Sequence, residues 1–318
     1  MSRLLAAALL LWICDAHAAE PPAHRLGLLA PTAPALHVLR QMTLEALERL
    51  GLVEGRNLAV AARWAPAGEL AEAARELLAT RPAVVVAESN AAIRALRAVS
   101  DTTPIVMSFA DEDPVAAGLA ASLMRPGGNV TGVVTLAPEL DAKRLELLRE
   151  VVPQARRIAA LVVSRGLEAQ QVTAMRAVAA RSGFKLVVVE APGPESYDAA
   201  FAAMRGAGVQ ALAIAAAPEL FFEVRRFAEM AGVHGLPTVC ESAIMARDGC
   251  LIGYGPDFVA LRRRAADYAA RILRGARPGD LAIEQPSTFE LAVNLATARA
   301  LGIAVPPSIL ARADEVIE

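Results

Sequence analysis

The chain has 318 residues and a formal net charge of −2, and its residues are 55% hydrophobic and 21% charged. This composition excludes wholesale disorder, and the length predicts two domains or lobes rather than one core. A nucleic-acid-binding protein normally carries a basic excess or a basic stripe, and this sequence shows neither.

The first predicted element is an export signal over residues 1–18. Arg3 supplies a positive start, and an apolar run follows from Leu4 to Ile13. Ala16 and Ala18 are the small residues that a signal peptidase reads. Since the run is too short to span a bilayer and no later stretch is long enough, we expect a soluble periplasmic protein.

A lipoprotein signal is the alternative at the same place. Residues 11–14 loosely resemble a lipoprotein box, in which Cys14 would carry lipid. The residue before that cysteine is normally small, and here it is Ile13. We therefore expect plain cleavage after Ala18, with lipidation left open.

The first half of the remaining chain alternates short apolar runs with amphipathic segments. The runs are apolar on both faces, as buried parallel strands are. We expect strands at 25–29, 57–63, 83–87, 104–108 and 129–134. We expect helices at 38–50, 70–79, 90–99 and 114–124.

The second half repeats this alternation. Expected strands are 157–163, 185–190, 210–215, 237–240, 250–253 and 288–293. Expected helices are 140–151, 169–181, 196–204, 220–231, 262–273 and 296–301. Strand followed by helix, many times over, predicts an α/β fold with parallel sheets covered by helices. Because no low-complexity linker divides the halves, we expect two lobes joined by short crossovers.

Loops after three of the expected strands carry candidate binding residues. In open α/β sheets, ligands bind beyond the carboxyl ends of the strands. These loops hold Thr32, then Ser89 with Asn90, then the acidic run 111–113. Backbone N–H groups at helix starts favour an anion, and the acidic run could hold an ammonium group. Together they suit a zwitterion such as an amino acid, although such residues also cap helices without any ligand.

Signals for catalysis and for metal or cofactor binding are missing from the sequence. There is no G-x-S-x-G elbow, no P-loop and no G-x-G-x-x-G after a strand. His24, His37 and His234 are scattered without ligand spacing. We therefore expect no enzymatic activity, no cofactor and no metal. Cys240 and Cys250 either form a disulfide, which an exported protein permits, or are two buried thiols.

Several strings resemble those of ABC-transporter substrate-binding proteins, in order along essentially the whole chain after the signal. They are Gly51–Leu58, Asp113–Val115, Arg125–Gly132, Lys143–Leu148, Tyr254–Pro256, Glu284–Pro286, Phe289–Leu291 and the tail from Pro306 to Glu318. The resemblance implies a type I periplasmic binding protein fold, with two Rossmann-like lobes joined by three hinge crossovers. Better-known members of that family bind aromatic amino acids such as tryptophan or tyrosine.

The resemblance also implies how the chain divides. Crossovers are expected near Thr135, Tyr254 and Pro286. One lobe would then hold residues 24–135 and 255–285. The other would hold 136–254 and 286–318, including a C-terminal helix.

The solute is expected between the lobes. Positions that carry over from the family are Thr32, Ser89, Asn90, Asp113 and Tyr254. Topology adds Ser164, Pro218 and Glu241 from strand-end loops of the second lobe, and Phe109 is a candidate for an aromatic contact. Two loops depart from the family pattern. Residues 216–218 lack the acidic residue that often precedes that loop, and residues 164–166 replace an Asn-Pro-type loop, which leaves the part of the solute they contact undetermined.

Capture by hinge closure is the function that the resemblance implies. A small solute would bridge the two lobes, and an ABC permease in the inner membrane would receive it. We expect a monomer that binds no nucleic acid. Two other classes remain as alternatives. One is a periplasmic sensor that signals ligand state to a membrane protein; the other is an exported α/β enzyme, which would need a nucleophile and base in contact.

Overall fold

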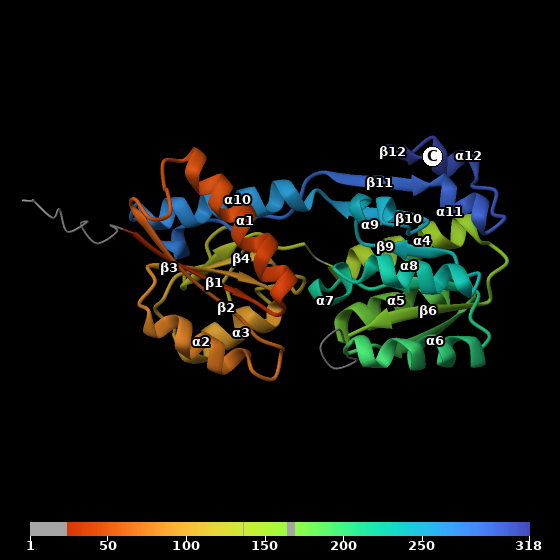
Figure 1. Ribbon diagram of the computed structural model, residues 1–318, viewed down its shortest axis with the longest axis horizontal. Coiled ribbons are helices and arrows are strands. Elements are labelled where there is room, and N and C mark those ends of the chain that lie inside the picture. Colours follow the sequence, from red (N-terminus) through yellow and green to blue (C-terminus); the bar gives the residue numbers. More distant parts are fainter. Residues whose placement is uncertain (1–23, 136, 164–168) are drawn as a thin grey trace, which may run out of the picture.

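The computed structural model describes residues 24–135, 137–163 and 169–318 (Figure 1). The expected export signal and Ser164 lie outside these residues. The described chain forms two α/β halves that lie side by side along the long axis of the molecule. None of its described helices has the length and apolarity that crossing a membrane requires.

Lobe 1, as we name it, is built around a five-stranded sheet in the order β2-β1-β3-β4-β5, with every pair parallel. Its strands are rich in Val, Ile and Leu, which favour buried parallel pairing. Its strands are β1 (His24–Ala30), β2 (Leu58–Trp64), β3 (Val84–Glu88), β4 (Ile105–Phe109) and β5 (Val130–Gly132). Its helices are α1 (Ala33–Arg49), α2 (Leu70–Ala79), α3 (Asn90–Val99) and α10 (Phe258–Leu273).

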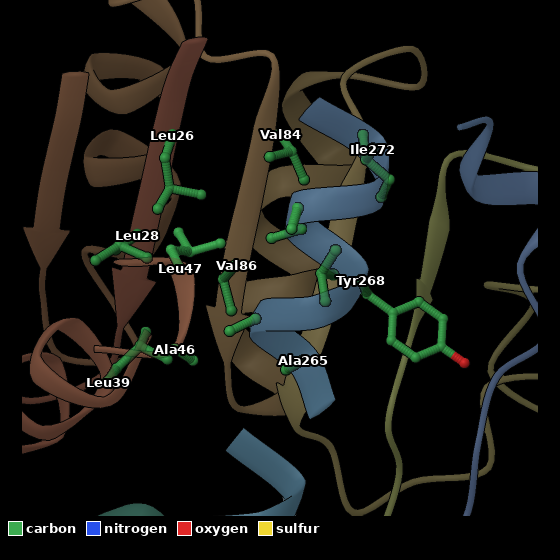
Figure 2. Packing of buried hydrophobic residues seen from close by; sticks show 14 of the residues in the cluster. Leu26, Leu28, Leu39, Ala46, Leu47, Val84, Val86, Ala265, Tyr268 and Ile272 are labelled. Atoms are coloured by element: carbon green, nitrogen blue, oxygen red, sulfur yellow. The ribbon is translucent and has the colours of Figure 1, made fainter. Parts of the chain in front are cut away.

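Helices cover both faces of the lobe 1 sheet. Because side chains alternate along a strand, Leu26 and Leu28 of β1 point to the same face of the sheet. There they pack with α10 and with Leu47 of α1 (Figure 2). Leu29 points to the opposite face and packs with α2 and α3, beside Leu70. Each such buried side chain contributes roughly 1.5–3 kcal/mol to folding. These layers hold the loops at the strand ends in place.

Lobe 2 is built around a seven-stranded sheet in the order β12-β11-β10-β9-β8-β6-β7. Of these pairs, β10 with β11 is antiparallel and the others are parallel. Its strands are β6 (Arg157–Val162), β7 (Lys185–Glu190), β8 (Ala211–Ile214), β9 (Thr238–Cys240), β10 (Ile252–Pro256), β11 (Phe289–Asn294) and β12 (Glu315–Ile317). Its helices are α4 (Ala137–Val151), α5 (Ala169–Ser182), α6 (Tyr197–Gly206), α7 (Pro218–Phe221), α8 (Val224–Val233), α9 (Ala243–Arg247), α11 (Leu295–Ala300) and α12 (Pro307–Leu310).

The predicted fold class is confirmed, since two mostly parallel α/β sheets are each covered by helices. The predicted helix at 114–124 is wrong. Those residues form turns: the Ala117 amide donates to the Asp113 carbonyl at 2.9 Å, and Gly118 adopts φ +69°. That left-handed backbone ends a helical turn, and glycine adopts it at little steric penalty.

The segment predicted as one helix at 220–231 is two. Pro218 starts the short α7, the Glu223 amide donates to the Leu220 carbonyl at 3.2 Å in a tight turn, and α8 begins at Val224. The lobe also contains α9, α12 and β12, which are too short to give a clear periodicity. The chain therefore finishes on the edge strand β12 after α12.

The chain passes between the lobes three times. The first passage lies between Thr135 and α4, the second between β10 and α10, and the third between Glu284 and β11. Glu284 still bridges to Val133 of lobe 1. Tyr254 lies inside β10, paired with Leu291, so the expected boundary at residues 254–255 falls within a strand of lobe 2.

Gly255 of β10 allows an unusually close approach of two backbones. A Cβ atom at this position would lie 1.9 Å from the carbonyl oxygen of Glu241. No side chain fits there without moving the loop after β9. The hinge strand and that loop are therefore fixed relative to each other.

Candidate functional site

A narrow cavity of about 50 Å³ lies between the two lobes. Its lobe 1 wall consists of Ser89, Asn90, Ala91, Arg94 and Asp111. Its lobe 2 wall consists of Val163, Gln171, Ala216, Ala217, Pro218 and Glu219. Most of these residues follow β3, β4, β6 or β8, so the cavity lies beyond the carboxyl ends of the strands, where open α/β sheets bind ligands.

The lobe 1 wall is organised by Ser89 and Asn90. The Ser89 hydroxyl accepts a hydrogen bond from the Ala92 amide at 3.2 Å and so caps α3. Ser89 also adopts φ +111°, a strained backbone conformation for a residue other than glycine. The Asn90 side-chain oxygen accepts from the Asp111 amide at 3.0 Å, which ties the loop after β3 to the loop after β4.

Asp111 brings a buried carboxylate to this wall. The Thr135 hydroxyl donates to it at 2.6 Å. Burial raises the pKa of Asp111 to about 7, because water no longer solvates the charged form. The Thr135 hydrogen bond opposes the shift, and the negative charge of Asp141 adds to it. Asp111 therefore titrates near neutrality.

The lobe 2 wall is held by a buried ion pair on α4. Arg144 donates to Asp141 at 2.6 Å, and both side chains are buried. Gln171 of α5 donates to Asp141 at 2.9 Å and to the Ala216 carbonyl at 3.0 Å. Arg144 also donates to the Tyr254 carbonyl at 2.7 Å. One network thus joins the cavity wall to the hinge strand.

Two glutamates bring further carboxyl groups to lobe 2. Glu219 lines the cavity, and burial raises its pKa. Glu241, which follows β9, is only 1% exposed, and neither carboxylate oxygen has a hydrogen-bond partner among the described residues. Burial raises the pKa of Glu241 well above its usual range; Arg144 opposes this, and Asp111 adds to it.

A second buried ion pair lies at the strand end of lobe 1. Arg262 of α10 donates to Glu88 at 2.6 Å. The guanidinium also lies over the ring of Phe109, 5.8 Å from its centroid. Burial raises the pKa of Glu88, and the charge of Arg262 opposes that rise.

Comparison with known proteins places this arrangement in a family. Residues 31–317 match the family described as ABC transporter substrate binding protein. The chain belongs to this family. Such proteins bind a small solute, typically work with an ABC permease, and are normally extracytoplasmic.

Individual relatives agree with the family match. The chain is 24% identical over 273 residues to a tyrosine-binding protein of Clostridioides difficile, which covers 84% of this chain and 77% of the relative. A conserved domain protein from Vibrio cholerae is 26% identical, with a TM-score of 0.82 over 92% of this chain and 99% of the other. An ABC domain from Streptococcus pneumoniae in complex with L-Trp is 23% identical, with the same TM-score and coverage. The fold is that of type I periplasmic binding proteins.

Three of the residues expected to bind solute line the cavity of this substrate-binding protein. They are Ser89, Asn90 and Pro218. Glu241 is buried behind the lobe 2 wall, within electrostatic reach of Asp111. Ser164 lies outside the described residues. The other four expected residues do not line this cavity.

Those four have other roles in the structure. Thr32 caps α1 by accepting from the Ala35 amide at 3.2 Å, and Asp113 caps the following turn by accepting from the Val115 amide at 2.8 Å. Phe109 is buried in the lobe 1 core, where it stacks on Phe258 with ring centroids 4.9 Å apart. Tyr254 stacks on Phe289 beside the hinge, with centroids 6.1 Å apart.

Sequence reasoning missed much of the lobe 2 wall of this substrate-binding protein. Arg144 lies in one of the family strings, and its spacing of three from Asp141 puts both on one face of α4, which is a usable signal. Gln171 and Glu219 carried no signal of their own. Arg94 is placed by α3 and forms an ion pair with Glu112.

Cys240 and Cys250 form a disulfide, with Cα atoms 6.3 Å apart. This decides between the two alternatives that the sequence left open. The bridge closes the loop that contains Glu241 and α9. It therefore fixes the position of the lobe 2 strand end beside the cavity.

Proposed function

We propose that this substrate-binding protein captures a small solute between its two lobes outside the cytoplasm and delivers it to an ABC permease for import. The observation that carries the proposal is the polar cavity between the lobes. One wall offers the start of α3 and the carboxylate of Asp111, and the other offers the loop that begins α7. Each lobe therefore supplies about half of the residues that line the cavity.

We propose an amino acid as the solute. The start of α3, at Ser89 and Asn90, presents the positive end of the helix dipole, which suits a carboxylate. Asp111 suits an ammonium group on the same wall. The relatives described above as binding tyrosine and L-Trp support this class.

Hinge closure follows from the way that the lobes are joined. Three short passages connect lobe 1 with lobe 2, so the lobes can rotate about them as near-rigid bodies. A solute that contacts both walls binds the closed form better than the open form. That difference in affinity is what shifts the population toward closure.

Export is supported by two features of the chain. The N-terminal residues have the order of charge, apolar run and small residues of a secretory signal. The Cys240–Cys250 disulfide is of a kind that forms in oxidising compartments and rarely persists in the cytosol. We propose the periplasm as the location, with the protein acting as a monomer.

A binding role rather than a catalytic one also fits the cavity. Among the described lining residues, Ser89 is the hydroxyl-bearing side chain, and its oxygen already caps α3. An activated nucleophile would need a base within hydrogen-bond reach. We therefore expect the protein to release the solute without any chemical change to it.

A thermal-shift screen against the amino acids tests this proposal. Binding to the folded state raises Tm, by an amount that corresponds to about 2.7 kcal/mol at a solute concentration one hundred times Kd. Isothermal titration calorimetry then gives the affinity and stoichiometry. We expect one solute per chain, recovered intact after release. Chemical conversion of the solute would contradict the proposal, as would the absence of any shift across the panel.

A further inference from the structure

We propose that the interlobe cavity selects a solute with a net positive charge, such as a basic amino acid or a short diamine. The inference rests on the proposed function and narrows the solute class of the same site. It concerns a second cationic group, beyond the ammonium that every amino acid carries. The charges around the cavity and the side chains that line it support the inference.

The ionisable side chains that line the cavity are acidic in excess. They are Asp111 from lobe 1, Glu219 from lobe 2 and Arg94 from α3. The Arg94 charge is balanced by Glu112 in a partly exposed ion pair. Within the part of the chain that the structure describes, two carboxyl groups on opposite walls are then left without an ion-pair partner. A single bound ammonium group can compensate one of them.

The imbalance extends into the protein behind the walls. Two buried guanidinium groups already form ion pairs: Arg144 pairs with Asp141, and Arg262 pairs with Glu88. Glu241 lies within electrostatic reach of both arginines, yet its carboxylate oxygens accept no hydrogen bond from any described residue. Among the described residues near the cavity, the buried acids therefore outnumber the buried cations.

Such an arrangement is unfavourable while the cavity is empty. A buried carboxylate without a counter-charge loses its hydration and gains little in return, so it takes up a proton instead. Asp111 accepts a hydrogen bond from Thr135 but has no cationic partner in the described structure. A cationic solute would supply the missing charge at the moment when the lobes close. The binding free energy thus comes partly from relieving this strain.

Aromatic side chains, by contrast, are absent from the described lining. Phe109 stacks on Phe258, and Tyr254 stacks on Phe289. Trp64 is 52% exposed and lines a different surface groove with Arg63 and Glu69. Recognition of an indole or phenol ring normally uses apolar and aromatic walls. The described lining has small apolar side chains, such as Ala91, Val163 and Pro218, but no aromatic ring on which an indole or phenol could stack.

Proton linkage follows from the same geometry. Thr135 donates a hydrogen bond to Asp111, and the charged groups within reach of it are Asp141 and Arg144 of α4, Glu219 of α7 and Glu241 after β9. With its pKa raised to about 7 by burial, Asp111 is largely protonated in mildly acidic solution. A cation beside it favours the ionised form, so binding should release a proton. The affinity should therefore rise as the pH rises through about 7.

Matched pairs of solutes test the proposal by isothermal titration calorimetry on the purified protein. L-Lysine is compared with L-norleucine, and L-arginine with L-citrulline, because each pair differs by one positive charge at nearly constant shape. Cadaverine, L-tryptophan and L-tyrosine complete the panel. We expect at least one cationic member to bind, and to bind at least tenfold more tightly than its neutral partner. A titration in buffers of different ionisation enthalpy should show proton release near neutral pH.

Variants locate the selection. Asp111→Asn and Glu219→Gln should each weaken binding of the cationic solute at least tenfold and reduce its advantage over the neutral partner. Asp113→Asn is the matched control, since Asp113 lies on the same loop but caps a turn outside the cavity; it should change the affinity less than twofold. Circular dichroism checks that each variant is folded.

The outcomes separate the inference from the proposed function. Equal binding of norleucine and lysine, or tighter binding of tryptophan or tyrosine, overturns the cationic selection and leaves amino-acid capture intact. Unchanged selectivity in the folded Asp111→Asn and Glu219→Gln variants also overturns it. If no solute in the panel binds, the cationic selection is overturned, and the thermal-shift screen against all the amino acids decides the proposed function separately.

Discussion

Each lobe has a buried glutamate at the carboxyl end of a strand, but the two glutamates differ in their partners. Glu88 ends β3 in lobe 1, and Arg262 donates to it at 2.6 Å. Glu241 follows β9 in lobe 2, and neither of its carboxylate oxygens has a hydrogen-bond partner in the described structure. The charge at the lobe 1 strand end is compensated within the protein. The carboxyl group at the lobe 2 strand end has no such partner among the described residues, and burial favours its neutral form.

The path of the chain explains the difference. Arg262 lies on α10, which follows β10 of lobe 2 but packs on the lobe 1 sheet, so the second passage between the lobes delivers a cation to Glu88. The buried cation of lobe 2 is Arg144, which forms its ion pair with Asp141 and not with Glu241. Glu88 of lobe 1 therefore has a cationic partner without a solute, whereas Glu241 of lobe 2 has none among the described residues.

Breaking the lobe 1 pair should have the largest effect on stability. Glu88→Gln removes the negative charge and leaves Arg262 buried without a counter-ion. Loss of one partner of a buried ion pair typically lowers the free energy of unfolding by about 3–5 kcal/mol. Urea denaturation at neutral pH measures it. A loss below about 1 kcal/mol would show that the pair does not compensate the charge as described.

The disulfide beside Glu241 should contribute the next largest effect. Cys240 and Cys250 are ten residues apart, and in the chain-entropy model closing a loop of that length stabilises the fold by about 3 kcal/mol. The double variant Cys240→Ser, Cys250→Ser should lower the stability by that order. A reductant should destabilise the parent protein and leave the double variant unchanged. Equal sensitivity of both to reductant would contradict the assignment.

The uncompensated acids predict an unusual dependence of stability on pH. The folded-state pKa of Asp111 is raised to about 7, above its ordinary value near 4, and that of Glu241 is also raised. Between these values the folded protein binds more protons than the unfolded chain does, so the free energy of unfolding falls as the pH rises. Asp111 alone should account for a loss of about 2 kcal/mol from about pH 5.5 to about pH 8, without solute.

Thermal melts across that range measure this effect. The Asp111→Asn variant should show a flatter dependence, because the amide does not titrate. A parent protein that grows more stable over the same range would contradict the raised pKa of Asp111. As the pH rises, we therefore expect the free energy of unfolding to fall while the affinity for the cationic solute rises.

The smallest effect is expected at Glu241. An acid kept neutral by burial is well imitated by an amide, so Glu241→Gln should change the free energy of unfolding by less than about 1 kcal/mol near neutrality, in contrast with Glu88→Gln. Parallel urea titrations of the two variants make the comparison directly. Equal losses would show that the two strand ends do not differ as described.

The fold was largely predictable from the sequence, because short apolar runs alternate with capped helices. The strand at 185–190 and the helices at 70–79 and 90–99 end where the pattern predicts. One of the two departures, at 114–124, arose where an Ala-rich segment is interrupted by Gly118 in a left-handed conformation. Local composition favoured a helix there, and the backbone conformation of one residue prevented it.

The site was predictable only in part. Ser89 and Asn90 were found because the carboxyl end of a buried strand is itself a signal. Asp141, Arg144 and Gln171 act through contacts between segments far apart in the sequence, such as the bond from Arg144 to the Tyr254 carbonyl, and no local pattern encodes them. The aromatic candidates Phe109 and Tyr254 pack within their own lobes. Residue type alone did not indicate which way they face.

A crystal structure of the protein with its tightest-binding solute tests the central claim most directly. The account predicts one solute molecule enclosed between the Ser89–Asn90 wall and the Ala217–Glu219 loop, with its cationic groups in contact with Asp111 and Glu219. A solute bound on the outer surface of one lobe, with the interlobe cavity unchanged, would contradict it.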